Sequence, residues 1–465
     1  INHFIMGNSK KKTSTRRSFI ATTTMATAGI ALGGRNLSAG SYNRIAGSNE
    51  KIRVGFIGTG NRGSQLLHTF MKMADCEIAA LCDVYEPYIT RDRSKVNPRY
   101  VDTRPLQIPR MGEDFPSRVE RYSDYRRMLE NKSIDAVCIS TPDHWHALQT
   151  IHSIEAGKDV YCEKPMGRTI EENNLMVKAA EKYKRVVQVG QWQRSDPHWL
   201  DSVNFIRSGK LGKIRLVRVY SYQGWNNSIP VVPDENAPEG VDYDMWLGPA
   251  PKRPFNKNRF HFTFRWFWDY AGGLMTDWGV HLLDFALFGM NVTTPKSVMA
   301  MGGKYGYPDD ACETPDSLQV IYEFDGFNVM WDHAIGINDG GYGRNAVLGF
   351  VGENGTLVVD RQGWEVIPEV VNNVVRMEAV PLTKGTGQGL NNNVQNHLDC
   401  IKRRDRKTNV NPEIAAHIAK LSAVGNIAYR TGKKLIWDGT KFTNDTEANN
   451  YLIPEYREPW KLPKL

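Results

Sequence analysis

The sequence predicts an α/β protein in two parts, a doubly wound parallel sheet followed by an α+β domain with a large, mostly antiparallel sheet. Three observations support this prediction. Short apolar strands alternate with helical segments over residues 51–193, and a glycine-rich turn follows the first strand. After residue 193, long strands succeed one another with few helices between them. Alternation of strand and helix is typical of parallel sheets, whereas successive strands favour antiparallel pairing.

The first domain is predicted over residues 51–193. Apolar, β-branched runs indicate strands at residues 52–57, 77–82, 136–140, 159–162 and 186–189. Helical spacing indicates helices near residues 66–70, 125–129, 146–156 and 171–183. Residues 93–119 are rich in proline and arginine and show little periodicity, so we expect an inserted loop that overhangs the ligand cleft.

The second domain is predicted over residues 194–432, with a surface-wrapping tail over residues 433–465. Its strands are expected at residues 214–222, 317–324, 328–334, 346–351 and 356–360. Helices are expected at residues 391–401 and 412–430, the latter with Asn411 as its cap and Pro412 at its first position. Because an exposed face of a large antiparallel sheet commonly packs on a second copy, we expect a homo-oligomer.

Composition is that of a globular chain long enough for two cores. Of 465 residues, 41% are hydrophobic and 24% are charged. Six of the basic residues precede residue 40, where no acidic residue occurs, so the formal charge of +8 falls to +2 over the remainder. Nucleic-acid binding needs clustered lysine and arginine on a folded face. We therefore expect no nucleic-acid partner.

Residues 1–39 have the pattern of a twin-arginine export signal. Arg16 and Arg17 precede an uncharged run over residues 20–34, and residues 37–39 are small enough for cleavage. The pattern predicts recognition by the twin-arginine machinery and a periplasmic location, with residues 40–50 as a linker. A membrane span needs about 20 strongly apolar residues, and threonine and glycine dilute this run. Export is favoured over a membrane anchor, and a lipid or membrane tether stays an open alternative.

The six cysteines are expected to be small buried thiols, because none has CxxC spacing and the first four lie in or beside apolar strands. They are Cys76, Cys82, Cys138, Cys162, Cys312 and Cys400.

The glycine-rich turn predicts a dinucleotide site of the Rossmann type. Gly58, Gly60 and Gly63 lie between a strand and a helix, and Asp83 ends the next strand. The first glycine allows a tight turn, the second a close approach of the pyrophosphate, and the third close packing of the helix, whose N-terminus offers N–H donors. Asp83 would bind the ribose hydroxyls and repel a 2′-phosphate, so NAD is preferred to NADP, although Arg62 could partly offset that repulsion.

Three further segments carry a resemblance to a known family. They read Ser140-Thr141-Pro142-Asp143-His144-Trp145-His146, Cys162-Glu163-Lys164-Pro165, and Gly-Gly-Leu-Met-Thr-Asp-Trp-Gly-Val-His-Leu-Leu-Asp over residues 272–284. Together with the glycine turn, and over about residues 51–432, they resemble the glucose-fructose oxidoreductase and inositol dehydrogenase (Gfo/Idh/MocA) superfamily. The resemblance implies an NAD(P)-dependent oxidoreductase that acts on a sugar or sugar derivative.

The resemblance also implies catalytic roles. Lys164 would contact the substrate hydroxyl and the nicotinamide ribose, and Asp277 and His281 would complete the catalytic group. Oxidation of an alcohol needs a base for the hydroxyl proton, which suits a histidine held by a carboxylate, while Lys164 would polarise the oxygen. At i, i+4 spacing, Asp277 and His281 are expected on one face of one helix. The competing interpretation is a structural helix with a core histidine. The Lys164–Pro165 bond is a candidate for the cis form.

The expected contacts cluster at the glycine turn and the strand ends. For the cofactor they are Gly58, Gly60, Asn61, Arg62, Gly63, Asp83, Thr141, Pro142, His144, His146, Glu163, Lys164 and Gln191. For the carbohydrate substrate they are Trp192, Arg194, Tyr222, Asp277 and His281. The resemblance adds Asn393 and His397 on a late helix. Aromatic residues alternate with polar ones over residues 260–268, and we expect one or two aromatics to contact sugar and the rest to be core. No metal site is predicted, because neither Asp277, His281 and Asp284 nor the two histidines of residues 144–146 have a familiar ligand spacing.

Export would separate the enzyme from any dinucleotide pool, so the cofactor would have to be recycled in place. One solution transfers the hydride to a second sugar. Another is a redox-neutral glycoside hydrolase, in which oxidation acidifies a neighbouring C–H, the glycosidic bond is eliminated and the hydride returns. The NAD-dependent α-N-acetylgalactosaminidases work in this way and are similar to the same superfamily, but Glu163-Lys164-Pro165 is not expected in that group. A non-catalytic sugar-binding protein is a third alternative, although it would not need Lys164, Asp277 and His281 together.

Overall fold

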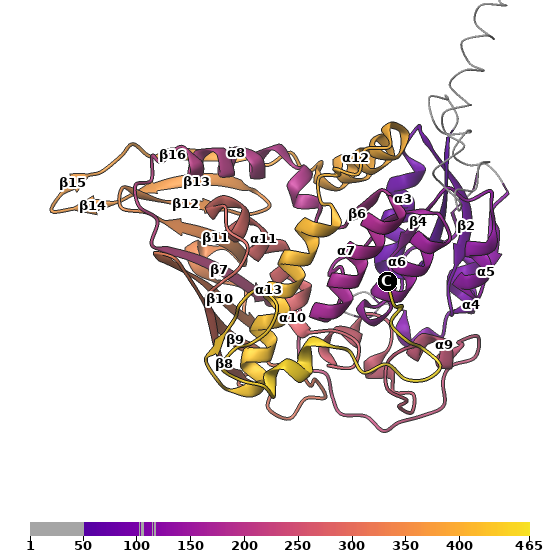
Figure 1. Cartoon of the computed structure of the whole chain (residues 1–465). Helices are drawn as coiled ribbons and strands as arrows, with labels where there is room; N and C mark the ends of the chain where they lie inside the picture. Colours follow the sequence, from indigo (N-terminus) through magenta and orange to yellow (C-terminus); the bar gives the residue numbers. More distant parts are fainter. Residues whose placement is uncertain (1–50, 102, 104–106, 114, 116–117) are drawn as a thin grey trace, which may run out of the picture.

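Two sheets with helices between them organise the chain (Figure 1). The computed structural model describes residues 51–101, 103, 107–113, 115 and 118–465. The expected export signal and linker, residues 1–50, lie outside the described residues. Among the described residues, no helix is both long enough and apolar enough to cross a membrane.

The first sheet is parallel throughout, as predicted. Its six strands are β1 (Ile52–Ile57), β2 (Cys76–Cys82), β3 (Glu120–Tyr122), β4 (Ala136–Ile139), β5 (Asp159–Cys162) and β6 (Val187–Val189). They lie in the order β3-β2-β1-β4-β5-β6, and each neighbouring pair is parallel. The strand order reverses between β1 and β4. In doubly wound sheets, ligands bind beyond the carboxyl ends of the strands at this reversal.

Helices cover both faces of the first sheet. They are α3 (Asn61–Met71), α4 (Glu86–Thr90), α5 (Tyr125–Glu130), α6 (Asp143–Glu155) and α7 (Ile170–Tyr183). Leu66, Leu67 and Phe70 of α3 are fully buried against the strands, so the helical spacing in the sequence does mark the buried face.

The second sheet has nine strands and is mostly antiparallel, as predicted. Its strands are β7 (Leu216–Gln223), β8 (Ser297–Gly303), β9 (Ser317–Phe324), β10 (Phe327–Ile335), β11 (Ala346–Val351), β12 (Gly355–Val359), β13 (Gly363–Pro368), β16 (Val380–Lys384) and β17 (Leu435–Ile436). The order is β16-β13-β12-β11-β7-β10-β9-β8-β17, and β7 and β10 form its parallel pair. A short hairpin, β14 (Val370–Val371) and β15 (Val374–Val375), projects beyond this sheet (Figure 1).

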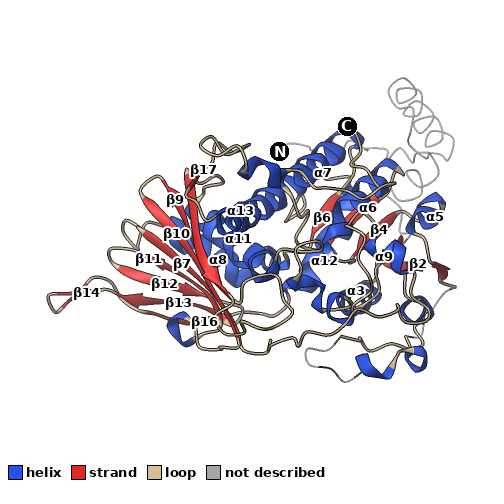
Figure 2. Cartoon of the chain, turned by 90° about the horizontal axis from the view of Figure 1, so that it is seen from below, coloured by secondary structure: helices blue, strands red, loops and turns tan. Residues whose placement is uncertain are grey.

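One face of the nine-stranded sheet is covered by helices. These are α8 (Pro197–Arg207), α11 (Gly279–Met290) and α13 (Pro412–Thr431), which share one apolar core with the strands (Figure 2). The opposite face, called the helix-free face because none of these three helices covers it, carries the alternate side chains of each strand. Among them, Met299 is 47% exposed, Met301 72% and Ile321 40%.

Late parts of the chain return to the first sheet. Helix α12 (Gly389–Arg403) packs Val394 and Leu398 into the core of β1 and α3. The tail reaches α6 on the other face of the sheet, where Trp460 contacts Trp145 with 4.8 Å between ring centroids. Helix α10 (Gly273–Asp277) lies between the two sheets, and helix α9 (Tyr243–Leu247) lies beside the first sheet (Figure 1). The cleft between the sheets is therefore built from many parts of the sequence.

The described cysteines are all free thiols, five of them buried and Cys312 half-buried. The prediction of small buried thiols is confirmed for those five.

Candidate active site

The glycine turn has the geometry that a bound pyrophosphate requires. Gly58 has φ +83°, and a Cβ at this position would lie 2.7 Å from the backbone nitrogen of Thr141. A Cβ on Gly63 would lie 2.1 Å from the carbonyl oxygen of Gly58, so only glycine lets α3 pack this closely. Gly60 caps α3 without a side-chain hydrogen bond, and no acidic residue lies in the first turn. A helix N-terminus without a capping side chain or an acidic first turn suits a bound anion.

Asp83 stands at the end of β2 with its carboxylate held in place. The backbone N–H groups of Thr59 and Tyr85 donate to it at 2.7 and 3.1 Å. Burial raises the pKa of Asp83 to about 6, although these hydrogen bonds and Arg91 act in the opposite direction. A positioned acceptor at this strand end suits the hydroxyls of a ribose.

A cavity of about 680 Å³ extends from the glycine turn to the second domain. Its lining includes the predicted residues Gly58, Gly60, Asn61, Arg62, Asp83, Thr141, Pro142, His146, Glu163, Lys164, Trp192, Asp277 and His281. The tight glycines, the open helix N-terminus, the oriented Asp83 and this volume together fit a nicotinamide dinucleotide.

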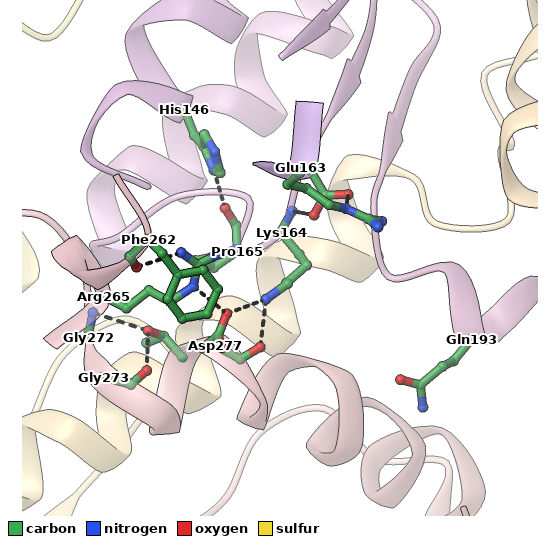
Figure 3. A network of polar contacts seen from close by, with 12 residues as sticks. His146, Glu163, Lys164, Pro165, Gln193, Phe262, Arg265, Gly272, Gly273 and Asp277 are labelled. Carbon is green, nitrogen blue, oxygen red and sulfur yellow. Dashed lines mark hydrogen bonds and ion pairs between the residues drawn. The ribbon is translucent and has the colours of Figure 1, made fainter. Parts of the chain in front are cut away.

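Lys164 and Asp277 meet in this cavity (Figure 3). Lys164 follows β5, and its Nζ donates to Oδ1 of Asp277 at 2.6 Å and to the Asp277 carbonyl at 2.8 Å. Arg265 also contacts Oδ1, with its Nε at 3.3 Å. Burial alone would raise the pKa of Asp277, but the two cations outweigh it and lower the pKa to about 2. Asp277 is thus a permanent anion that positions the Lys164 ammonium.

The backbone and neighbours of Lys164 fix its position. The Lys164–Pro165 bond is cis, as proposed from the sequence. Oε2 of Glu163 accepts the Lys164 N–H at 3.0 Å, and Oε1 pairs with Nε of Arg62 at 2.8 Å. Glu163 is buried and so ties the glycine-turn helix to the end of β5. His146 contacts the carbonyls of Pro165 and Thr141, at 2.7 and 2.9 Å, and so joins two strand ends.

His281 lines the cavity with a ring that burial keeps neutral. Burial, and then the positive charges of Lys164, Arg361 and Arg62, lower its pKa well below the ordinary value. Its Nδ1 is buried without a hydrogen-bond partner among the described residues. A neutral imidazole beside a lysine can accept a proton from a substrate hydroxyl.

Asp277 and His281 do not share one helix, contrary to the expectation from their spacing. Asp277 ends α10 and His281 lies in α11, with Trp278 between the two helices. No hydrogen bond joins the two side chains in the described part of the chain, because Asp277 is engaged by Lys164 and Arg265. Both residues nevertheless line the same cavity.

Several predicted contacts lie outside the cavity. Gly63 packs beneath the turn, and His144 turns its Nε2 to the Trp246 carbonyl at 3.0 Å. Arg194 is paired with the fully buried Asp284, with 2.8 Å between Nε and Oδ1. Gln191 is buried and does not line the cavity.

Three more predicted contacts are separated from the cavity by the fold. Tyr222 lies on the helix-free face of β7, where its hydroxyl donates to Asp332 at 3.2 Å. Asn393 and His397 face the core between α12 and the first sheet, where Oδ1 of Asn393 accepts from Tyr161 at 2.9 Å. The sequence correctly assigns these residues to a strand and a helix, but it does not show that their side chains point away from the cavity.

Sequence reasoning missed several residues that line the cavity. They are Tyr88, Asp143, Trp278, Arg265, His261 and Arg361. Asp143 could have been found from its place inside the Thr141–His146 motif. Arg361 follows β12, nearly two hundred residues after Lys164, and no local signal marks it. The aromatic wall holds Trp192 as expected, and also Trp225, Trp246 and three phenylalanines of residues 260–264.

Among the described residues, no group of three or more histidine, cysteine, aspartate or glutamate side chains could hold a metal ion.

Two protein-family models match most of the chain. Residues 52–191 match "Oxidoreductase family, NAD-binding Rossmann fold" of the Gfo/Idh/MocA family, and residues 203–462 match "Oxidoreductase family, C-terminal alpha/beta domain". The two matches follow the two sheets described above.

Individual relatives are more distant. A glycosyl hydrolase family 109 protein of Shewanella sp. (strain ANA-3) is 31% identical over 170 residues, which are 37% of this chain and 35% of that protein. A second, from Shewanella baltica (strain OS185), is 30% identical over 43% of this chain and 44% of its own length. The chain thus spans less than half the length of these curated relatives. A levoglucosan dehydrogenase solved with NADH and levoglucosan has a TM-score of 0.60 at 18% identity, covering 83% of this chain and 99% of that structure, which shows a shared fold.

Proposed function

The chain belongs to the Gfo/Idh/MocA oxidoreductase family, and on this premise we propose that it oxidises a hydroxyl group of a sugar or sugar derivative with tightly held NAD. The observation that carries the proposal is the convergence of Lys164, Asp277 and His281 in the cavity that begins at the glycine turn. When bound, the nicotinamide ring supplies the acceptor for a hydride.

The side chains divide the remaining work. The Lys164 ammonium, held by Asp277, polarises the substrate oxygen and stabilises the charge that develops on it. The neutral His281 takes the hydroxyl proton as the C–H bond gives up its hydride, so the alcohol loses one hydride and one proton, to separate acceptors, and becomes a carbonyl. Trp192 and the aromatic wall provide faces for sugar stacking and exclude water.

NAD is preferred to NADP in this proposal. The carboxylate of Asp83 lies where a 2′-phosphate would be repelled. Arg62, which could offset that repulsion, is engaged by Glu163.

A redox-neutral glycoside hydrolase is the second candidate, favoured by the similarity to family 109 glycosyl hydrolases. This cycle needs a group that can exchange protons near neutral pH. Asp143 meets this need, because it lines the cavity and burial raises its pKa to about 6.

Export and association complete the proposal. The twin-arginine pattern at Arg16 and Arg17 supports transport of a folded, cofactor-loaded protein to the periplasm, where one NAD would serve many turnovers. Exposed Met299, Met301 and Ile321 on the helix-free sheet face support a homo-oligomer.

The test is to purify the protein without residues 1–39, release bound nucleotide by denaturation, and identify it. Free sugars and aryl glycosides are then screened with and without added NAD. We expect bound NAD, and a reduced nicotinamide when the correct sugar is added. Aglycone release without net NADH would replace the dehydrogenase by the hydrolase, and the absence of both nucleotide and turnover would refute the proposal.

A further inference from the structure

The turn between β12 and β13 carries Arg361 into the active-site cavity. Asp360 shapes this turn, since its Oδ1 accepts from the N–H groups of Gln362 and Gly363 at 2.8 and 3.1 Å. The Asp360 N–H donates to the Gly363 carbonyl at 2.9 Å. The turn is anchored from below, where Nε2 of the buried His198 contacts the Asp360 carbonyl at 2.9 Å. The position of Arg361 is therefore fixed by the scaffold.

The guanidinium of Arg361 lies between two tryptophan rings. Its Cζ is 4.4 Å from the centre of the Trp278 ring and 4.8 Å from that of Trp192. Nη2 donates to Oε1 of Gln193 at 3.4 Å, a long hydrogen bond to a neutral amide. Stacking on aromatic faces holds the planar group in one orientation and leaves its N–H edge available for hydrogen bonds.

Within the described residues, Arg361 is the basic residue of the cavity that makes no ion pair with a carboxylate. Four lysine and arginine side chains line the cavity. Arg62 is paired with Glu163, and Lys164 and Arg265 are both paired with Asp277. Within the described part of the chain, no ion pair involves Arg361. Burial and the nearby Arg62 lower its pKa to about 10, against the attraction of Asp277, so the group remains a cation at neutral pH.

Among the described residues, the charge of Arg361 is thus left without a paired carboxylate at the reacting end of the cavity, although Asp143 and Asp277 also line it. Arg361 lies beside the catalytic group, since the ring centroids of the two tryptophans that it contacts, Trp278 and Trp192, lie 6.1 and 6.4 Å from that of His281. The pyrophosphate has its own donors at the glycine turn. A single guanidinium with a free edge matches one carboxylate through two parallel hydrogen bonds.

We propose that Arg361 binds a carboxylate of the substrate, and that the enzyme therefore acts on acidic sugars such as uronic acids or their glycosides. The proposal rests on the proposed function, because it assigns the substrate class of the same site. Gln193 orients the guanidinium, and the two tryptophans hold it.

The experiment compares matched acidic and neutral sugars on the NAD-loaded protein. Glucuronate and glucose, galacturonate and galactose, and mannuronate and mannose are tested as pairs, together with their phenyl glycosides. Binding is measured by calorimetry, and turnover by the absorbance of the reduced nicotinamide. We expect at least one acid to bind more tightly than its neutral partner, and Arg361→Gln to reduce that preference by 10- to 100-fold.

Matched variants give the controls. Arg376→Gln removes an exposed arginine outside the cavity and should leave the preference unchanged. Arg361→Lys keeps the positive charge but cannot form two parallel hydrogen bonds to a carboxylate. It should therefore recover only part of the preference for the acid over the neutral sugar. Thermal midpoints of all variants show that each is folded.

Several outcomes would overturn the proposal. The first two are equal affinity for the acid and its neutral partner in every pair, and no binding of either. The third is a higher affinity for glucose 6-phosphate than for any uronate. The fourth is a loss of NAD affinity in Arg361→Gln as large as the loss of affinity for the acid. Because calorimetry does not need turnover, Arg361-dependent uronate binding without any reduction of NAD would refute the proposed function and leave this inference standing.

Discussion

Asp143 and Asp277 lie in the same cavity but have opposite proton affinities. Lys164 and Arg265 contact Asp277 directly and hold its pKa at about 2, against the effect of burial. Asp143 has no ion pair among the described residues, and burial raises its pKa to about 6 despite the attraction of His146, Arg265 and Lys164. The first carboxylate can only position a cation, while the second can give or take a proton near neutral pH.

The raised pKa of Asp143 predicts a pH-dependent cost to stability. Below about pH 4 the group is protonated in both the folded and the unfolded chain, so it costs nothing. Between about pH 4 and 6 the unfolded chain ionises first, and stability falls as pH rises. Asp143→Asn should therefore stabilise the protein by about 2 to 3 kcal/mol at pH 7 and by almost nothing at pH 4. Unfolding free energies of both proteins over this pH range test this, and a constant difference would contradict it.

Lys164 and His281 should matter for turnover more than for cofactor binding. Neither touches the glycine turn, and each faces the substrate end of the cavity. Lys164→Ala and His281→Ala should each lower kcat/KM by about 10²- to 10⁴-fold, because each removes polarisation or proton transfer. The Kd for NAD should change only a few-fold. Lys433→Ala, which removes an exposed lysine paired with Asp445 outside the cavity, is the control, and unchanged turnover in both site variants would refute the assigned roles.

Helix α3 and the glycine turn show how an element depends on single atoms. A methyl group at residue 63 would meet a backbone oxygen at 2.1 Å, whereas one at Gly60 meets the movable Tyr88 ring at 3.1 Å. Gly63→Ala should therefore destabilise the fold by about 1 to 3 kcal/mol and weaken NAD binding. Gly60→Ala should retain most of the stability while losing NAD affinity. Thermal midpoints and NAD titrations separate the two effects, and equal thermal midpoints in the two variants would contradict the packing argument.

Helices and strands with strong local signals could be predicted from the sequence, but the direction in which their polar side chains point could not. The five apolar runs of the first sheet and the Asn411-Pro412 helix start follow from periodicity and capping, and all are present. The sequence predicts Arg194 at the substrate because it follows the last strand of the first sheet, and Tyr222 because aromatic faces stack on sugars. A buried carboxylate, Asp284, binds Arg194, and strand alternation turns Tyr222 to the opposite face. The orientations of these two side chains depend on partners about 90 and 110 residues away in the sequence.

In the whole molecule, the cavity forms where segments from distant parts of the sequence come together. The glycine turn comes from the start of the described chain, Lys164 from the end of β5, His281 from α11, and Arg361 from a hairpin turn of the second sheet. The family motifs could identify the first three, since each motif is local in sequence. The last arises only when β12 and β13 are placed against the first domain, so a sequence pattern could not reveal it. On the proposed assignment, substrate selection depends on how the two sheets meet, while the chemistry depends on local motifs.

The helix-free sheet face leads to a prediction about assembly. Met299 lies opposite Ile321 in the antiparallel register of β8 and β9, and Met301 is the next residue along the same face. Side chains this apolar and exposed favour contact with another copy, because burying them removes apolar area from water. We expect the protein to sediment as an oligomer, and Met301→Lys combined with Ile321→Lys to shift it toward the monomer at micromolar concentration.

The matched control is Ile453→Lys, which adds charge at an exposed apolar residue of the tail, away from this face. It should leave the sedimentation coefficient unchanged. Since neither Met301 nor Ile321 lines the cavity, the NAD content of the monomer should equal that of the oligomer. A wild-type protein that is monomeric at every concentration, or a double variant that assembles as well as the wild type, would show that this face is not the contact.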